Sequence, residues 1–191
     1  MRLFSYFATV IAAAVIFSGC KKETQTINIT PEMISAFAEA AYNGTVEAVA
    51  QFLQNGMPVD QTEENGNTAL MLAAFNGHIE TMKKLIDAGA IIDLRDSNGR
   101  TALMFASTGP YPSAVKLLLE HGADVNAADV VEKWTPVMFA AGEGLSPVVD
   151  ILLQHGADPK MKDKDDDTAA DFARGRGFIQ LADKLQKLID K

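Results

Sequence analysis

Apolar residues recur at helical spacing in several short stretches of the chain. Positions three or four apart share one face of a helix, so each stretch predicts an amphipathic helix. The clearest sets are Ile79, Met82, Leu85 and Ile86; Val115, Leu118 and Leu119; and Val148, Ile151 and Leu152. A Gly-Ala pair follows the first set at Gly89-Ala90 and recurs after the other two. The pattern therefore predicts short helices separated by glycine turns.

The pattern repeats with a period of 33 residues. Gly44 and Gly77 are 33 residues apart, and the same step leads to Pro110 and then, with one extra residue, to Gly144 and Gly177. Two further series keep this register: Gly56, Gly89, Gly122 and Gly156; and Thr68, Thr101, Thr135 and Thr168. A fixed period of this length is typical of repeat proteins, in which each unit buries its apolar face against its neighbours.

Each unit contains the same local motifs. A turn such as Asn65-Gly66 precedes Thr68-Ala69-Leu70-Met71, an alanine-rich helix follows, and a second helix ends in a Gly-Ala turn. This resembles the ankyrin repeat, a β-turn plus two helices with a Thr-Pro-Leu-His signature. Thr135-Pro136-Val137-Met138 is the nearest copy of that signature, and His121-Gly122-Ala123-Asp124-Val125-Asn126 is similar to the repeat end of the family. The resemblance extends from about Thr30 to Lys191.

The resemblance implies an all-α ankyrin-repeat solenoid of about five helix-turn-helix repeats with β-turn tips. The repeated threonine is expected to cap the first helix, and small alanines there let neighbouring repeats approach closely. In the last repeat Phe178, Leu181, Ala182, Leu185, Leu188 and Ile189 are expected to face inward, with a polar back that caps the solenoid. The expected repeats are 30–62, 63–95, 96–129, 130–162 and 163–191.

The N-terminus has the layout of a targeting signal. Met1-Arg2 precedes an apolar run over residues 3–17, which is short for a membrane-spanning helix. Phe17-Ser18-Gly19-Cys20 then resembles a bacterial lipobox, and Cys20 is the single cysteine of the chain. The resemblance implies a lipoprotein signal peptide over residues 1–19, a lipid on Cys20 and a tether over residues 20–29. The alternative is an ordinary secretory signal with a chance cysteine.

The residue after Cys20 bears on location. It is Lys21 rather than Asp, which by resemblance to enterobacterial lipoproteins favours the outer membrane, facing the periplasm. The expected location is therefore the bacterial cell envelope.

The charge of the chain and the motifs that it lacks narrow the range of possible functions. A net charge of −8 over 191 residues argues against general affinity for nucleic acid. The sequence has no Gly-x-Ser-x-Gly elbow, no phosphate-binding Gly-Lys-Ser/Thr loop and no cysteine besides the lipobox one, so no enzyme and no cofactor is expected. The chain is expected to be a monomer.

Two departures from the repeat pattern point to either binding or packing. Trp134, the single tryptophan, lies at a turn tip in the unit with the extra residue. It is either a binding residue or a ring packed on the adjacent repeat. Pro110-Tyr111-Pro112 must remodel the loop between the helices of the third repeat, because proline is excluded from helix interiors. That loop either presents Tyr111 outward or folds it over itself.

Three residue sets suggest metal binding, and a structural role is favoured for each. Met71, Met104 and Met138 would form a stacked column, best explained as packing rather than as soft-metal ligands or an oxidant trap. The three histidines lack a cysteine partner for zinc. The run at Asp163–Asp167 begins like a calcium loop, but Thr168 and Arg174 replace the required Gly and Glu. It is expected to be a solvated acidic finger that can contact a basic partner.

We expect the function to be protein binding by a membrane-anchored scaffold. The partner is an unidentified protein, and the acidic balance suits a basic one. By position, the concave face of the resembling family maps to Tyr42, Asn65, Asn67, Phe75, Asn76, Arg100, Tyr111, Glu132, Trp134, Glu143 and Asp167. Alternatives are an immunity or stress-protection factor for an envelope toxin or enzyme, a structural envelope spacer, and an unrecognised enzyme.

Overall fold

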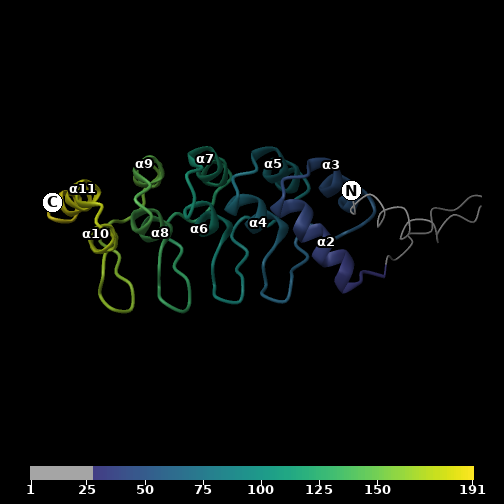
Figure 1. Cartoon of the computed structure of the whole chain (residues 1–191), viewed down its shortest axis with the longest axis horizontal. Helices are drawn as coiled ribbons and strands as arrows, with labels where there is room; N and C mark the ends of the chain where they lie inside the picture. The colour runs from purple at the N-terminus through teal and green to yellow at the C-terminus, as the bar shows by residue number, and fades with distance from the viewer. Residues whose placement is uncertain (1–27) are drawn as a thin grey trace, which may run out of the picture.

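The computed structural model describes residues 28–191. The signal peptide, Cys20 and most of the tether expected from the sequence lie outside the described residues. The described part forms ten helices arranged in five pairs (Figure 1). This confirms the all-α solenoid of repeats. Within it, no helix is long and apolar enough to span a bilayer.

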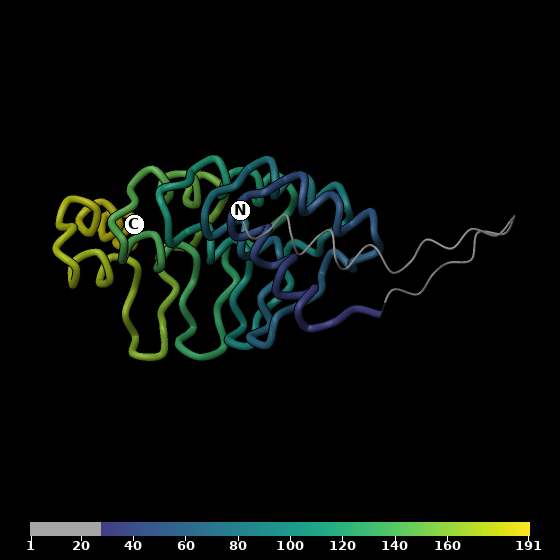
Figure 2. The backbone as a smooth tube through the Cα atoms, turned by 45° about the vertical axis from the view of Figure 1, so that its right-hand side comes forward, coloured from purple at the N-terminus to yellow at the C-terminus, as the bar shows by residue number. Residues whose placement is uncertain are grey.

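The helix pairs stack side by side in two rows. The inner row contains the first helix of each repeat: α2 (Pro31–Tyr42), α4 (Ala69–Phe75), α6 (Ala102–Ala106), α8 (Pro136–Gly142) and α10 (Ala169–Gly175). The outer row contains the second helices: α3 (Val46–Gln54), α5 (Ile79–Asp87), α7 (Pro112–Glu120), α9 (Ser146–Gln154) and α11 (Ile179–Ile189). Four hairpin loops project from the inner row, away from the outer helices (Figures 1 and 2).

The core runs without interruption between the two rows. Alanines of the inner helices, including Ala73, Ala106 and Ala140, are fully buried, as expected for closely approaching repeats. The outer helices contribute Met82, Leu118 and Leu152, which are also fully buried. Burying a side chain of this size contributes about 1.5–3 kcal/mol. Because each helix pair buries its apolar face against the next pair, the stack is stable only as an array.

The repeated threonine caps its helix in some repeats and not in others. The hydroxyls of Thr30 and Thr68 accept hydrogen bonds from the backbone N–H three residues ahead, at 3.4 and 3.3 Å. The hydroxyls of Thr101 and Thr135 are buried without a partner among the described residues. The Thr168 hydroxyl instead donates to Asp171 at 2.6 Å. The expected hydroxyl cap is therefore present at Thr30 and Thr68, while all five threonines occupy the N-cap position of their helices.

The loop of the third repeat folds over the preceding repeat. The hydroxyls of Ser107 and Thr108 donate to carbonyls of α6, and this helix is five residues long. Tyr111 turns back over Gly77, which has a φ of +67° and lies so close that an added Cβ would be 2.4 Å from the Tyr111 ring. Of the two predicted arrangements, Tyr111 adopts the folded one.

In the last repeat Phe178 departs from the expected design, and the expected inward residues Leu188 and Ile189 are only half-buried. Leu181, Ala182 and Leu185 are buried, and the exposed Lys184 forms an ion pair with Asp150 of α9. Phe178 was expected to face inward, but it is 39% exposed because it precedes α11 and its ring covers Gly144 of the fourth repeat. It thus takes the position that Tyr111 takes in the third repeat.

The extra residue of the repeat pattern lies in the hairpin before α8. In two of the other hairpins a buried Asp pairs its backbone N–H with a carbonyl four residues on, as from Asp96 to Arg100 and from Asp163 to Asp167. In the hairpin before α8 the pairing runs from Asp129 to Trp134, one residue further. Lys133 has a φ of +62° two residues before the helix-starting threonine, the position at which Gly66, Gly99 and Asp166 also have a positive φ. The extra residue is therefore accommodated within the hairpin, before the start of α8.

Candidate functional site

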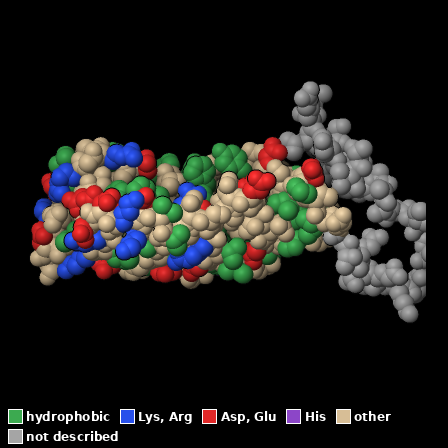
Figure 3. Space-filling view, turned by 90° about the horizontal axis from the view of Figure 1, so that it is seen from below, with side chains coloured by type: hydrophobic (Ala, Val, Ile, Leu, Met, Phe, Trp, Pro, Cys, Tyr) green, Lys and Arg blue, Asp and Glu red, His purple; other side chains and the backbone are tan. Residues whose placement is uncertain are grey.

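We define the inner face as the surface formed by the inner helices, the C-cap residue that directly follows each of them, and the hairpins. Ten of the eleven residues expected to bind a partner belong to these elements: Tyr42, Asn65, Asn67, Phe75, Asn76, Arg100, Glu132, Trp134, Glu143 and Asp167. Tyr111 does not, since it lies in the loop between α6 and α7. Seen from the hairpin side, charged side chains are dense toward the C-terminal repeats and sparse toward the N-terminal ones (Figure 3). The two ends of the inner face therefore differ in how many charged side chains they expose.

Three aromatic side chains follow one another along the N-terminal part of the inner face. The rings of Tyr42 and Phe75 are 6.3 Å apart and nearly parallel, and the ring of Phe105 meets Phe75 edge-on, also at 6.3 Å. We call these residues the aromatic row. Tyr42 is 45% exposed and Phe75 is 39% exposed. Large aromatic side chains held in place yet open to solvent are the residue type that most often dominates binding energy at protein interfaces.

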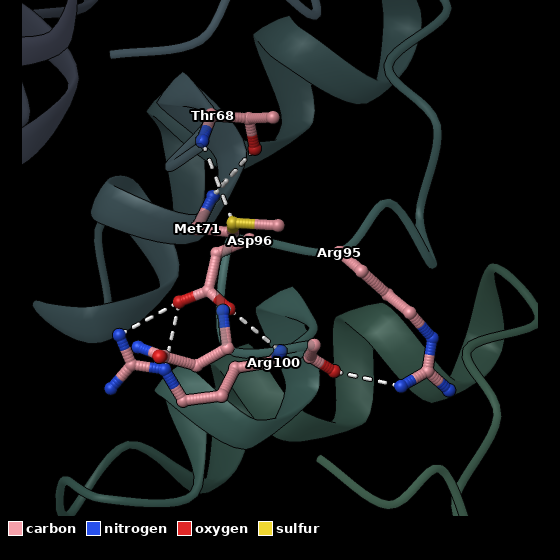
Figure 4. A network of polar contacts seen from close by, with 7 residues as sticks. Thr68, Met71, Arg95, Asp96 and Arg100 are labelled. Atoms are coloured by element: carbon pink, nitrogen blue, oxygen red, sulfur yellow. Dashed lines mark hydrogen bonds and ion pairs between the residues drawn. The ribbon is translucent and has the colours of Figure 1, made fainter. Parts of the chain in front are cut away.

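The hairpin beside the aromatic row is fixed by Asp96. The Asp96 side chain is buried, and its Oδ1 accepts hydrogen bonds from the backbone N–H groups of Asn98 and Arg100 at 2.9 and 2.8 Å. Its Oδ2 accepts from the Arg100 guanidinium, with Nη2 at 2.7 Å (Figure 4). The guanidinium carbon also lies 4.6 Å from the centre of the Phe105 ring. The Arg100 guanidinium therefore has two partners, the Asp96 carboxylate and the Phe105 ring, and its charge is paired within the chain.

Arg95 links the same hairpin to the next. Its Nη1 donates to the carbonyls of Gly99 and Ala128, both at 2.7 Å. Figure 4 shows Arg95 pointing away from Asp96 while Arg100 points toward it. Arg95 thus orients the backbone of two hairpins, whereas the Arg100 guanidinium is paired with a carboxylate.

A second aromatic group lies at the C-terminal part of the inner face. The ring of Trp134 meets Phe139 and Phe172 edge-on, at 5.4 and 5.1 Å. Its Nε1 donates to Asp163 of the following hairpin at 3.2 Å. We call Trp134, Phe139 and Phe172 the aromatic joint, because they connect the fourth and fifth repeats. Of the two interpretations of Trp134, the geometry is that of a ring packed on the adjacent repeat.

The hairpin before α10 exposes several carboxylates. Asp163 is buried and accepts backbone hydrogen bonds from Asp165 and Asp167, both at 2.9 Å, so Asp165, Asp166 and Asp167 project outward. We call these three residues the acidic finger. Partial desolvation, followed by the charges of the surrounding Asp residues, raises the pKa of Asp167 above its usual value. The carboxylates of this hairpin thus disfavour further negative charge beside them.

The neighbouring Asp171 responds differently. Hydrogen bonds from the side chain and backbone of Thr168 lower the pKa of Asp171, and Arg174 lowers it further. The charged Asp171 side chain therefore stabilises the start of α10. Within the described residues, no cluster of His, Cys, Asp or Glu is arranged to hold a metal ion.

Two methionines of the predicted column make structural contacts. The sulfurs of Met71 and Met138 each lie 3.4 Å from the backbone nitrogen of the threonine that begins their helix, and accept a hydrogen bond from it. Met71, Met104 and Met138 are all buried. This geometry supports the packing interpretation of the column.

Several of the predicted binding residues are occupied by contacts within the chain. The Asn76 side chain donates to the Tyr42 carbonyl at 2.7 Å, and the ring of His78 bonds to the same oxygen. Glu132 pairs with Lys164 of the next hairpin. Asn67 is half-buried, whereas Asn65 and Glu143 are exposed. Asn76 and Glu132 therefore hold repeats together.

Sequence reasoning missed three aromatic positions. Phe105, Phe139 and Phe172 occupy equivalent places in successive inner helices and form contacts on the inner face. Their spacing of 34 and 33 residues follows the repeat period. Combining this series with that of Tyr42 and Phe75 would have shown that aromatic residues recur along the inner face.

The hairpins are joined to one another through their backbones. Ser97 N–H donates to the Asn65 carbonyl, Val130 N–H to Asn98 and Lys164 N–H to Glu132, each at 3.0 Å. This hairpin ladder holds the tips in a fixed register. The inner face is thus a preformed surface, which lowers the entropic cost of binding.

Comparison with known families agrees with this architecture. A model for ankyrin repeats in three copies matches residues 37–129, and a model for a single ankyrin repeat matches residues 132–164. The chain belongs to the ankyrin-repeat family. Proteins of this family are typically binding scaffolds rather than enzymes. A search of curated proteins found no match.

Proposed function

We propose that this chain is an envelope-anchored scaffold that binds another protein through its inner face. Ankyrin repeats are a protein-interaction architecture, and that much follows from the family. The observation that carries the specific proposal is the aromatic row. Tyr42 and Phe75 are held in place by neighbouring rings and by the repeat stack, yet close to half of each side chain faces solvent. Covering them would remove apolar surface from water at little ordering cost.

The anchoring part of the proposal rests on the sequence. A short apolar run followed by Phe17-Ser18-Gly19-Cys20 fits a lipid attached to Cys20, and Lys21 favours the outer membrane. Stable anchoring requires two or more acyl chains. Expression in a bacterial host tests this directly. The native chain is expected to partition into detergent and to carry lipid mass, and Cys20→Ser is expected to lose both. An unlipidated native chain would contradict the anchor.

The binding part of the proposal is tested by affinity capture from the native envelope. Three baits are compared: the full chain, Phe75→Ala, and Ile179→Ser as a matched control. Ile179 is also an exposed apolar residue, but it lies on the outer helix α11. We expect a protein that the full chain and the Ile179 variant retain and that the Phe75 variant loses. Equal capture by all three baits would reject the inner face. Capture of nothing would favour a structural spacer.

A further inference from the structure

The aromatic side chains of residues 28–191 are distributed unevenly. Phe37 and Phe52 belong to the core, and Tyr111 and Phe178 cover glycines of preceding repeats. The remaining six all line the inner face: Tyr42, Phe75, Phe105, Trp134, Phe139 and Phe172. Of these six, Tyr42 and Phe75 are the exposed ones, so a partner that covers this face meets open aromatic surface at the N-terminal part.

The basic residues of the inner face are largely consumed within the chain. Arg100 is paired with Asp96, and Lys164 is paired with Glu132. Lys162 faces Asp166 at 3.5 Å, and Arg174 faces both Asp171 and Asp183. Among the described residues of this face, Arg95, Lys133 and Arg176 form no ion pair, and Arg95 donates instead to two backbone carbonyls.

The acidic residues of the inner face are more numerous and less engaged. Five are exposed and form no ion pair within the described part of the chain: Glu39, Glu64, Glu143, Asp165 and Asp167. Glu39 belongs to α2 and Glu64 to the hairpin before α4, while Asp165 and Asp167 belong to the acidic finger. The face therefore combines exposed aromatic rings with unneutralised negative charge.

We propose that the inner face takes an extended segment of a protein partner that carries bulky apolar side chains followed by lysine or arginine. The apolar side chains cover Tyr42 and Phe75, and the cations lie against the acidic finger. An acidic segment would be repelled, and a purely basic one would leave the rings in water. This inference rests on the proposed function and adds the chemistry of the partner.

The length of the segment follows from the stack. Neighbouring helices pack about 8–10 Å apart, so the path from α2 to α10 measures roughly 30–40 Å. An extended chain covers about 3.3–3.6 Å per residue, which requires about 12 residues. A segment of this length reaches from the aromatic row to the acidic finger.

Synthetic peptides of about 12 residues test the chemistry without knowledge of the natural partner. The first carries a leucine and tyrosine half followed by a lysine half. The second replaces lysine with glutamate, and the third replaces leucine and tyrosine with serine. Binding of each labelled peptide to the purified full chain is followed by fluorescence anisotropy. We expect the first peptide to bind and the other two to bind about tenfold more weakly or not at all.

Variants of the chain locate the binding. Phe75→Ala is expected to weaken the first peptide about tenfold, and the double variant Asp165→Asn with Asp167→Asn is expected to weaken it and increase its tolerance of salt. Ile179→Ser and Glu47→Gln are the matched controls on outer helices, and both are expected to leave binding unchanged. Circular dichroism of each variant checks that the fold is retained.

Three outcomes would overturn the inference. They are absence of binding by the first peptide, equal binding of the first and third peptides, and equal loss in the control variants. These outcomes are distinct from failure of the proposed function. If the chain captures an envelope protein through Phe75 but binds no peptide, the partner chemistry is wrong and the scaffold role stands. If the peptide binds but no envelope protein is captured, the partner chemistry stands and the role as an envelope scaffold is wrong.

Discussion

The aromatic row and the aromatic joint are built from the same kind of residue on the same face, but their surroundings differ. In the row, Tyr42 and Phe75 stack on each other and remain 45% and 39% exposed. In the joint, Trp134 has rings on two sides and a hydrogen bond to Asp163 of the next hairpin. The row belongs to successive inner helices, whereas the joint spans from a hairpin to the next repeat.

This difference separates two uses of an aromatic side chain in a solenoid. A ring that bridges two repeats contributes to folding, because its removal opens the contact between them. A ring that stays exposed contributes little to folding and is available to a partner. Removal of Trp134 is therefore expected to reduce stability more than binding. Removal of Phe75 is expected to reduce binding more than stability.

The largest expected effect is the loss of stability in Trp134→Ala. Removal of the indole leaves a cavity against Phe139 and Phe172 and leaves Asp163 without its side-chain donor, at a cost of about 3 kcal/mol. Urea unfolding followed by circular dichroism measures the change. Trp134→Phe keeps a ring in the joint and is expected to retain most of the stability. A loss below about 1 kcal/mol in the alanine variant would show that the joint does not hold the last repeat.

The next effect is the separation of binding from stability in Phe75→Ala. Because the side chain is partly exposed, we expect a stability loss of about 1 kcal/mol or less, together with about tenfold weaker binding of the captured partner. Titration calorimetry measures the affinity, and Trp134→Phe provides the comparison at the joint. Equal losses of affinity in both variants would remove the distinction between the two aromatic groups.

A smaller effect is expected from acid at the start of α10. Since hydrogen bonds from Thr168 lower the pKa of Asp171 in the folded chain, its charged form stabilises the fold. That contribution is present above the unfolded pKa of about 3.9 and is lost as pH falls through the lower folded value. Urea midpoints measured from about pH 6 to about pH 3 should fall less steeply in Asp171→Asn than in the native chain. Parallel curves would contradict the assignment.

The smallest effect is expected in the acidic finger. The pKa of Asp167 is raised by partial desolvation and by the surrounding carboxylates, so its ionised form is disfavoured in the folded chain. Asp167→Asn should therefore raise the thermal midpoint slightly near neutral pH, and added salt should reduce the gain. Asp158→Asn, in the turn before this hairpin, serves as a control for a change of one charge. A lower midpoint in the Asp167 variant would show that Asp167 is stabilising.

The repeat architecture was predictable because key residues recur along the sequence at a fixed interval. The glycine and threonine series located all five helix pairs, and the amphipathic sets identified Met82, Leu118 and Leu152 as core residues. The outcome for Phe178 was not predictable by helical spacing, because this residue precedes α11 and its position depends on Gly144 of the neighbouring repeat. The spacing of residues within one repeat does not predict which residues it contacts in the next repeat.

The inner face was predictable as a location but not in its internal contacts. Position in the repeat identified Asn76, Arg100 and Trp134 as surface residues. It did not show that Asn76 bonds to Tyr42, that Arg100 is paired with Asp96, or that Trp134 packs on the next repeat. These contacts depend on which side chains meet across the stack, and that becomes visible only in three dimensions.

The hairpin ladder has a consequence for how such a protein changes over time. Its hydrogen bonds join backbone N–H and carbonyl groups, and the donors belong to residues as unlike as Ser97, Val130 and Lys164. Any residue except proline supplies the same donor. Mutations at the tips can therefore replace the chemistry presented to a partner while the scaffold keeps its shape. Selection for a new binding target can act on these positions without first having to rescue the fold.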